Sequence, residues 1–381
     1  PLMFFTSESV TCGHPDKVCD QIADRILDEL LRQDPLSRVA CEVTCITDQV
    51  HIFGEVTTEA DLDYETVARQ VIREIGYNEA GLGFDASTCR VCVDLHRQSP
   101  DIARGITRGS EEERLNTGAG DQGMMFGFAC RQTADLMPLP IELAHTLAKR
   151  LEQVRRTGEL EELLPDGKTQ VTVEYQDGVP VHLSAIVVSA QHREGVSLQK
   201  LRDDIEARVI LPAVPSELLD DRTQIYINPT GRFVLGGPAA DSGLTGRKLI
   251  ADTYGGYARH GGGSFSGKDA TKVDRSGAYM ARYAAKNIVA HGLADACEVQ
   301  LSYAIGLAEP MSVRVDTFGT EKIPSAQIEE RLLRAMDARP AAIIDRFSLT
   351  RPCFSSVSCY GHFGSNARDL PWEATDLAME N

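Results

Sequence analysis

One pattern of predicted secondary structure occurs three times along this chain of 381 residues, and it constrains the fold more than any other feature. Each occurrence runs helix, strand, strand, helix, strand, with a spacing of about 120 residues, a typical domain length. A chain this long also exceeds the size at which a single hydrophobic core keeps growing. The sequence therefore predicts an α/β (α+β) protein of three similar domains, each a mixed sheet with helices on one face, over residues 1–100, 112–229 and 230–381.

The repeat is read from hydrophobic spacing and turn residues. Apolar side chains recur at every fourth position from Val18 to Leu30, which is typical of one helix face. Three ordinary α/β stretches could look alike by chance, but a glycine-rich or charged loop precedes the first helix of each unit. The predicted elements are a helix from Val18, strands at 39–46 and 50–56, a helix at 61–75 ended by Gly76 and a strand at Val91; a helix at 140–154, strands at 171–175 and 179–190 joined by Gln176-Asp177-Gly178, a helix capped by Ser197 and a strand at 224–227; and a helix after Asp274, strands at 298–306 and 313–317 and a helix capped by Ser325.

Composition excludes several classes of protein. The net charge of −17 argues against binding to nucleic acid or to an anionic membrane, so a site for a polyphosphate would need locally clustered cations. No apolar run reaches the ~18 residues of a membrane span, and the first residues lack the basic region of a signal peptide. Cys89 and Cys92 form a CxxC on a predicted strand. Residues three apart on a strand face opposite sides, so these two cysteines could not share a metal ion. We expect a cytoplasmic protein whose ten cysteines are reduced.

The first loop, Gly-His-Pro-Asp-Lys at 13–17, precedes a helix. Pro15 suits the first helical position, and the free amides of a helix N-terminus attract anions. His14 and Lys17 would add donors and charge, and Asp16 would suit a Mg²⁺ ion that bridges phosphates. A plain helix cap explains the same residues, and for this loop alone it is the favoured interpretation.

The third loop, GGGSFSGKD at 261–269, nearly fits a phosphate-binding P-loop. Asp269 stands where a P-loop needs Ser or Thr, and no apolar strand precedes it, so a Walker-type NTPase is disfavoured. What remains is a glycine-rich backbone with Lys268, Lys272 and Asp274 at a helix start, which suits phosphate oxygens and a metal ion. A flexible solvated loop explains this less well, because so many glycines are costly to order without a ligand.

Two further segments are rich in glycine. The second loop of the repeat is GAGDQG at 118–123, although it lies some way before its helix. Residues 231–248 contain five glycines and the three cations Arg232, Arg247 and Lys248. Arginine binds phosphate with two parallel hydrogen bonds, and Phe233 could stack on a base. A long surface loop is the alternative, but glycines alternating with apolar residues favour a loop that wraps a ligand.

Together these motifs resemble the S-adenosylmethionine synthetase family. The resemblance extends over 5–10, 98–102, 118–126, 229–256, 261–276, Gly361-His362-Phe363-Gly364 and Pro371-Trp372-Glu373, which is nearly the whole chain. It implies three domains about a pseudo-threefold axis, and a homotetramer of two tight dimers with active sites between subunits. It also implies synthesis of S-adenosylmethionine from ATP and methionine, by attack of sulfur on C5′ and release of tripolyphosphate, which is then hydrolysed to pyrophosphate and phosphate.

The resemblance also implies roles for individual residues. Residues 98–108 would form a mobile loop over the site. The catalytic residues would be His14, Asp121, Arg247, Lys248 and Lys268; the ATP ligands His14, Asp166, Lys168, Arg232, Phe233, Asp241, Arg247, Lys248, Gly262 and Lys268; the methionine contacts Glu55, Gln98, Asp241 and Lys272; the Mg²⁺ ligands, for two ions in each site, Asp16 and Asp274; and the K⁺ ligand Glu42.

Three positions depart from the family pattern, none of them a direct ligand: Cys12, Leu95-His96-Arg97 and Ser365. Two alternatives stay open at this point. A kinase or ATPase with the same cations would release ADP. A catalytically inactive partner that only binds nucleotide should have lost cations or carboxylates, and all of them remain here.

Overall fold

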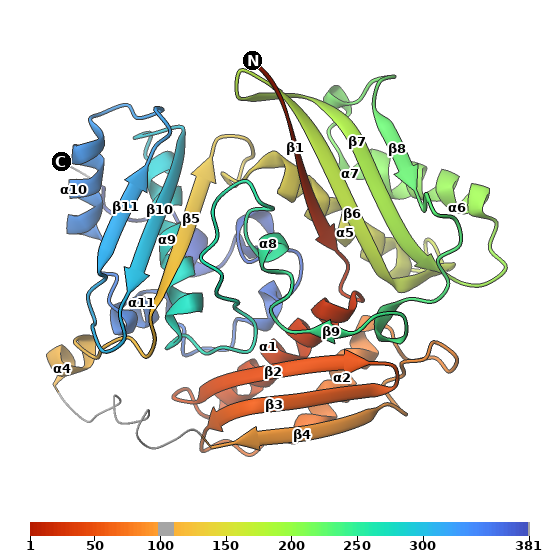
Figure 1. Ribbon diagram of the computed structural model, residues 1–381, viewed down its shortest axis with the longest axis horizontal. Coiled ribbons are helices and arrows are strands. Elements are labelled where there is room, and N and C mark those ends of the chain that lie inside the picture. The colour runs from red at the N-terminus through yellow and green to blue at the C-terminus, as the bar shows by residue number, and fades with distance from the viewer. Residues whose placement is uncertain (98–109, 380–381) are drawn as a thin grey trace.

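The computed structural model describes residues 1–97 and 110–379, and it contains three sheets with helices packed against them. Figure 1 shows the three sheets around a common middle region, as expected for three similar units about a pseudo-threefold axis. The predicted α/β fold class is therefore confirmed. The strands are β1 (Leu2–Val10), β2 (Arg38–Ile46), β3 (Gln49–Thr57), β4 (Arg90–His96), β5 (Gly123–Cys130), β6 (Leu163–Gln176), β7 (Val179–His192), β8 (Gln224–Ile227), β9 (Gly243–Leu244), β10 (Ala296–Tyr303) and β11 (Ser312–Asp316).

Each sheet is packed against one long helix. These helices are α1 (Pro15–Gln33), α5 (Leu139–Arg156) and α9 (Val273–Ala290), and they cover the sheets that contain β2, β6 and β5. Helix α9 is buried on nearly every side, which is expected of a helix enclosed between its own sheet and other parts of the chain. The other helices are α2 (Tyr64–Ile75), α4 (Glu111–Leu115), α6 (Leu198–Ile205), α7 (Leu211–Ala213), α8 (Leu249–Asp252), α10 (Ser325–Ala335) and α11 (Pro340–Phe347), with a π-helical turn at Glu206–Ile210 and 3₁₀ turns at Ser216–Leu218, Gly237–Ala239, Ser355–Val357, Gly364–Ala367 and Pro371–Glu373.

The strand orders are β4-β3-β2-β9, β1-β6-β7-β8 and β11-β10-β5. The first two sheets are mixed as predicted, because β3 pairs with β4 and β7 with β8 in parallel. In the third sheet both described pairings are antiparallel, so the prediction of a mixed sheet was wrong there. The reason is that the parallel strand of the other two sheets follows a helix, whereas α10 is followed by a second helix, α11.

Each third of the chain contributes one strand to the sheet of another third. β1 pairs with β6 of the second sheet, β5 pairs with β10 of the third, and β9 pairs with β2 of the first. The exchange is cyclic (Figure 1), which fits three similar units about one axis. The segments 1–100, 112–229 and 230–381 stay a prediction as domain boundaries, since none of them forms its sheet alone.

Helix ends follow local chemistry, with two corrections. The helix predicted from residue 61 begins at Tyr64, because the Asp63 side chain caps it by accepting the Thr66 amide at 3.1 Å. Ser325 was predicted as a cap but is the first residue of α10, and Pro324 occupies the cap position without a side-chain hydrogen bond. The hairpin turn has positive φ at Asp177 (51°) and Gly178 (82°), as a tight turn between twisted strands requires.

None of the described helices is long and apolar enough to cross a membrane. All ten cysteines are free thiols, and eight of them are buried. Cys89 lies just before β4, whereas Cys92 is within it, so the two residues of the CxxC are not on one regular strand.

Two histidines are enclosed in the interior without charge. The Nδ1 atom of His145, on α5, lies 2.7 Å from the Ser9 hydroxyl, and burial lowers the pKa of His145 to about 3. Tyr279 contacts Nδ1 of His362 at 2.6 Å, and burial lowers the pKa of His362 well below its usual value. Both rings are therefore neutral in the folded protein at pH values where they would be protonated in the unfolded chain.

This difference makes stability fall with acid. Below the ordinary histidine pKa of about 6.5 the unfolded chain binds protons that the folded chain excludes, so the free energy of unfolding drops by about 1.4 kcal/mol per pH unit for each ring. Between pH 7 and pH 5 we expect a loss of about 2 kcal/mol per histidine. For His145 the loss continues down to its folded pKa of about 3. Urea unfolding of wild type and His145→Asn at both pH values measures this, and an equal pH dependence in the two proteins would contradict it.

Candidate active site

The N-terminus of α1 forms the first half of the site. His14 is the N-cap residue, and its Nδ1 accepts the Asp16 amide at 3.1 Å. Burial and the nearby charge of Lys248 lower the pKa of His14 to about 3, so the ring is neutral. Because Nδ1 is an acceptor, the single proton of the neutral ring must be on Nε2. His14 can therefore donate a hydrogen bond to an anion at the helix N-terminus.

Asp16 links this helix end to two cations of the 231–248 segment. Its Oδ2 lies 2.5 Å from Lys248 Nζ, its Oδ1 accepts the Leu244 amide at 3.0 Å, and Arg247 Nη1 lies 3.9 Å from Oδ1. Burial works to raise the pKa of Asp16, but the hydrogen bonds from Lys248 and Leu244 outweigh it and lower the pKa. We call His14, Asp16, Arg247 and Lys248 the α1 cluster. It combines a carboxylate with three potential donors to phosphate.

Asp166 and Lys168, on β6, stand beside the α1 cluster. Lys168 pairs with Val10 of β1, and its positive charge contributes to the lowered pKa of His14. Asp166 Oδ2 accepts the Gly237 amide at 2.8 Å, whereas Oδ1 is buried without a hydrogen-bond partner. Burial raises the pKa of Asp166 to about 6. An unpartnered buried acceptor of this kind is suited to a donor on a bound molecule.

The start of α9 forms the second half of the site. Lys268 Nζ lies 3.0 Å from Asp274 Oδ2, and Lys272 Nζ lies 2.6 Å from Asp269 Oδ1. Gly263 lets the loop backbone approach the carboxylate, because a Cβ at this position would lie 2.4 Å from Asp274 Cγ. We call Lys268, Lys272 and Asp274 the α9 cluster. The sequence marked Asp269 only as a departure from a P-loop, but here it anchors Lys272.

The loops that carry the two clusters both pair with β2. Lys268 forms a β-bridge with Ala40, and Leu244 pairs with Thr44. Four residues of strand span about 13 Å. Their loops also touch, since a Cβ on Gly246 would lie 2.7 Å from the Ser264 side chain. Arg247 and Lys268 are therefore on adjoining loops.

Glu42 lies between the two clusters on β2. Its carboxylate accepts the Thr245 hydroxyl, and burial raises its pKa. The positive charge of Lys268 works to lower the pKa of Glu42, and the negative charge of Glu55 works to raise it. Glu55, on β3, pairs with Ala40 of β2. The predicted metal ligand and the predicted methionine contact thus share one face of the first sheet.

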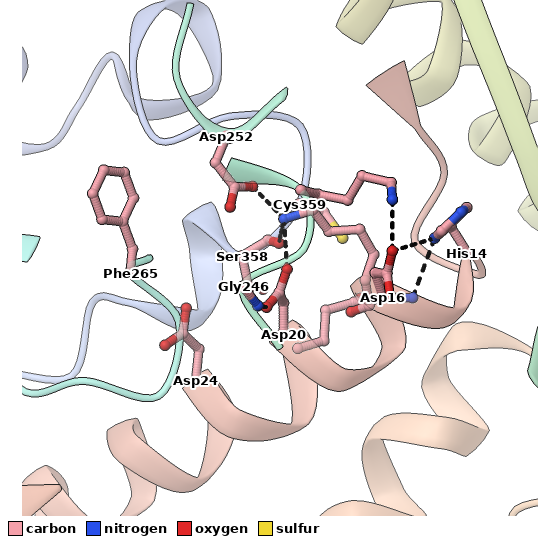
Figure 2. A network of polar contacts seen from close by, with 12 residues as sticks. His14, Asp16, Asp20, Asp24, Gly246, Asp252, Phe265, Ser358 and Cys359 are labelled. Carbon is pink, nitrogen blue, oxygen red and sulfur yellow. Dashed lines mark hydrogen bonds and ion pairs between the residues drawn. The ribbon is translucent and has the colours of Figure 1, made fainter. Parts of the chain in front are cut away.

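The prediction that Lys17 adds charge to the phosphate-binding loop was wrong. Its ammonium group is buried, where it contacts Asp252, donates to Asp20 Oδ2 at 3.0 Å and donates to the Ser358 carbonyl at 2.9 Å. Figure 2 labels these three acceptors. Burial opposes the charged form of Lys17, but Asp20 and Asp252 outweigh burial and raise its pKa. Lys17 ties α1 to α8 and to the C-terminal segment.

Three family models match successive parts of the chain. They describe the N-terminal domain of S-adenosylmethionine synthetase over residues 2–100, the central domain over 116–233 and the C-terminal domain over 235–374. The chain belongs to the S-adenosylmethionine synthetase family. Membership assigns it methionine adenosyltransferase activity, the synthesis of S-adenosylmethionine from ATP and methionine, in a family that uses divalent metal ions.

Several residues that the S-adenosylmethionine synthetase resemblance assigns to substrates lie apart from the two clusters in their described contacts. The Arg232 side chain is exposed, with Nη2 2.6 Å from Glu194 Oε1. The Phe233 amide donates to His192 Nε2 at 3.0 Å. Asp121 is exposed and accepts the amide of its neighbour Gln122.

Two further assigned residues lie near the clusters, and one lies outside the described part of the chain. Asp241 is exposed at the surface, and its charge contributes to the raised pKa of Asp166. Gly262 has a φ of 93°, and its amide donates to His260 Nδ1 at 2.8 Å. Gln98 and the predicted mobile loop 98–108 lie outside the described residues.

Proposed function

We propose that the α1 and α9 clusters hold the triphosphate of ATP so that the methionine sulfur attacks C5′. The observation that carries this proposal is the grouping of Arg247, Lys248 and Lys268 on adjoining loops that pack along the first turns of α1. This local concentration of positive charge occurs in a chain whose net charge is −17. A tripolyphosphate is the ligand that needs such a concentration, because its negative charge grows as it leaves.

The reaction does not require a general base. A thioether sulfur has no proton to lose, so the residues must align the two reactants and stabilise the leaving group. Charge-assisted hydrogen bonds contribute about 1.5–3 kcal/mol each. His14 Nε2, Arg247, Lys248 and Lys268 would donate them, and Lys168 would hold the remaining phosphate oxygens. Arg232, which is exposed and pairs with Glu194, is assigned to the triphosphate by motif alone. The same donors would retain tripolyphosphate for its hydrolysis to pyrophosphate and phosphate.

Asp16 and Asp274 are the proposed magnesium ligands, and Glu42 the proposed potassium ligand. Among the described residues no group of three or more His, Cys, Asp or Glu side chains could hold a metal ion alone. This fits Mg²⁺, which is commonly bound by one or two carboxylates together with substrate phosphates. Two Mg²⁺ ions bound with ATP would neutralise phosphate charge. Within the chain, Lys248 forms an ion pair with Asp16 and Lys268 forms one with Asp274, and these ion pairs keep the two carboxylates oriented.

The remaining substrate contacts are proposed by motif. Asp166 Oδ1, buried and unpartnered, suits a hydroxyl of the nucleotide, and Phe233 would lie against the adenine. Asp121 would stand near the ribose or the sulfur. The proposed methionine contacts are Glu55, Gln98, Asp241 and Lys272.

We also propose a cytoplasmic homotetramer, a dimer of dimers with active sites between subunits. Large apolar side chains are exposed near both clusters, among them Met124 and Ile250. Ile250 lies two residues after Lys248, and Met124 lies next to Gly123, which approaches Asp274. Exposed apolar surface beside a polar site is typical of an interface.

The proposed function is tested by incubating the protein with ATP, methionine, Mg²⁺ and K⁺. We expect a sulfonium product together with equal amounts of pyrophosphate and phosphate. Omission of K⁺ should slow the reaction, and omission of Mg²⁺ should stop it. Formation of ADP without a sulfonium product would instead identify a phosphoryl-transfer enzyme.

Replacing His14 by asparagine separates its two roles. Asparagine is an effective N-cap acceptor, so the α1 terminus and the unfolding midpoint should stay close to wild type. The Nε2–H donor is lost, and we expect turnover to fall about 10²-fold. Steady-state kinetics with a thermal-unfolding control check this. Wild-type turnover in His14→Asn would remove His14 from the set of phosphate ligands.

A further inference from the structure

Four aspartates are spaced by one helical turn along α1: Asp16, Asp20, Asp24 and Asp28. Residues four apart lie on one face of a helix, and acidic residues on such a face are usually solvated. Here all four side chains are buried, with exposures of 3%, 0%, 0% and 3%. Burying a row of carboxylates costs free energy unless each oxygen is paired.

Each of these carboxylates accepts backbone amides from the C-terminal half of the chain. Asp16 accepts the Leu244 amide at 3.0 Å, Asp20 the Gly246 amide at 3.0 Å, and Asp24 the Gly267 amide at 2.9 Å. Asp28 accepts the Phe354 and Ser355 amides at 3.0 and 2.9 Å. Figure 2 shows the side chains of Asp16, Asp20 and Asp24 along this helix face, with Gly246 beside Asp20.

The amides held by Asp20 and Asp24 belong to the two loops that carry the cations. Gly246 directly precedes Arg247 and Lys248, and its φ of 75° places it in the left-handed region. Gly267 directly precedes Lys268 and has a φ of 83°. Glycine has the widest range of backbone conformations. A fixed acceptor at each glycine amide therefore determines the position of the cation that follows it.

Asp24 secures its loop with the help of Arg275. The Arg275 guanidinium, fully buried, donates to both Asp24 oxygens at 2.7 and 3.0 Å. It also donates to the carbonyls of Phe265 and Lys268 at 3.0 and 3.3 Å. The loop around Lys268 is therefore held at one amide by Asp24 and at two carbonyls by Arg275.

We propose that Asp20 and Asp24 are positioning residues of the triphosphate site, each fixing the loop that carries one group of cations, while Asp28 makes the same contact to the C-terminal segment. This inference rests on the proposed function. It assigns these acidic side chains a role in polyphosphate binding, although their own charge repels the ligand. A positioning role and a direct effect of the charge therefore predict different tripolyphosphate affinities for the same substitutions.

Substitutions at Asp20 can distinguish these two roles. Asp20→Asn retains an oxygen acceptor for the Gly246 amide and removes the negative charge. Its amide nitrogen then faces Lys17, which keeps Asp252 and the Ser358 carbonyl as acceptors. Asp20→Glu retains the charge beside Lys17 but displaces the carboxylate by one methylene, and thereby displaces Gly246. Asp28→Glu is the matched control, because it makes the same change on the same helix face at a residue that holds Phe354 and Ser355.

The test is calorimetric titration of each full-length variant with tripolyphosphate and Mg²⁺, combined with amide exchange over residues 243–248. We expect Asp20→Glu to weaken tripolyphosphate binding about tenfold, which corresponds to 1.4 kcal/mol, and to speed exchange at 243–248. Asp20→Asn and Asp28→Glu should stay within about threefold of wild type, and the KM for methionine should not change in any variant.

Three outcomes would overturn the inference. Wild-type affinity in Asp20→Glu would exclude a positioning role. Weaker binding in Asp20→Asn than in Asp20→Glu would mean that the ion pair of Asp20 with Lys17, and not its contact with the Gly246 amide, is what binding requires. Equal weakening in Asp28→Glu would reduce the effect to general destabilisation. If wild type itself does not bind tripolyphosphate, the proposed function fails as well, and that result is distinct from the other three.

Discussion

Lys268→Ala is expected to lower the rate of S-adenosylmethionine formation about 10³-fold while the protein stays folded. The Lys268 ammonium contacts Asp274 at 3.0 Å at the start of α9, and the loop backbone around it is held independently by Asp24 and Arg275. Removal of the ammonium should therefore leave the loop in place and delete one of the proposed donors to the departing tripolyphosphate. Stopped-time assays of the sulfonium product measure the loss, and circular dichroism measures the folded state.

The matched control is Lys322→Ala. Lys322 forms an ion pair with Asp295 at 2.6 Å on the surface, outside both clusters. Its removal should leave turnover unchanged, because exposed pairs contribute little. Asp274→Ala should resemble Lys268→Ala in rate. Wild-type turnover in Lys268→Ala and Asp274→Ala would refute the roles assigned to the α9 cluster.

Arg282→Met is expected to lower the free energy of unfolding by about 3–5 kcal/mol, the largest effect on stability predicted here. Arg282, on α9, is fully buried, and its guanidinium donates to Glu373 at 2.8 and 2.9 Å. It also donates to the carbonyls of Phe128 on β5 and Asp135 at 2.7 Å. Methionine fills similar volume but leaves the Glu373 carboxylate paired only with Lys286 and the Gly364 amide.

Urea unfolding of Arg282→Met at pH 7 measures this loss. Arg368→Ala is the control, because Arg368 pairs with Asp135 in the same region but is largely exposed. Its unfolding midpoint should match wild type. Equal midpoints for Arg282→Met and wild type would show that this buried ion pair does not secure the C-terminal segment.

The sequence predicted the elements that local periodicity specifies. α1, β2, β3 and β8 appear within a few residues of their predicted positions, because their hydrophobic spacing reflects one buried face. The exchanged strands β1, β5 and β9 were missed. β1 pairs with residues 158 to 174 positions away, β9 has two residues, and β5 begins within a glycine-rich stretch that was interpreted as a loop. Non-local pairing leaves little trace in a local pattern.

In the candidate site, too, local motifs predicted some residues, and others could not be predicted because their partners are distant in the sequence. His14, Asp16, Lys268 and Asp274 were found from contiguous motifs, since a helix start and a glycine-rich loop specify their own geometry. Lys17 was misassigned because its direction depends on Asp252, more than 200 residues away. The aspartates of α1 beyond the first loop were not recognised, because the amides they accept come from loops that only the folded chain brings close.

The central claim is that carbon, and not phosphorus, is attacked while the chain's cations hold the triphosphate. It is tested most directly with ATP that carries oxygen-18 in the bridge between C5′ and the α-phosphorus, followed by mass spectrometry of the products. We predict that all of the label leaves in the phosphate and pyrophosphate, because the C5′–oxygen bond breaks. Label retained in the nucleoside fraction would mean that a phosphorus–oxygen bond breaks, and would contradict the account.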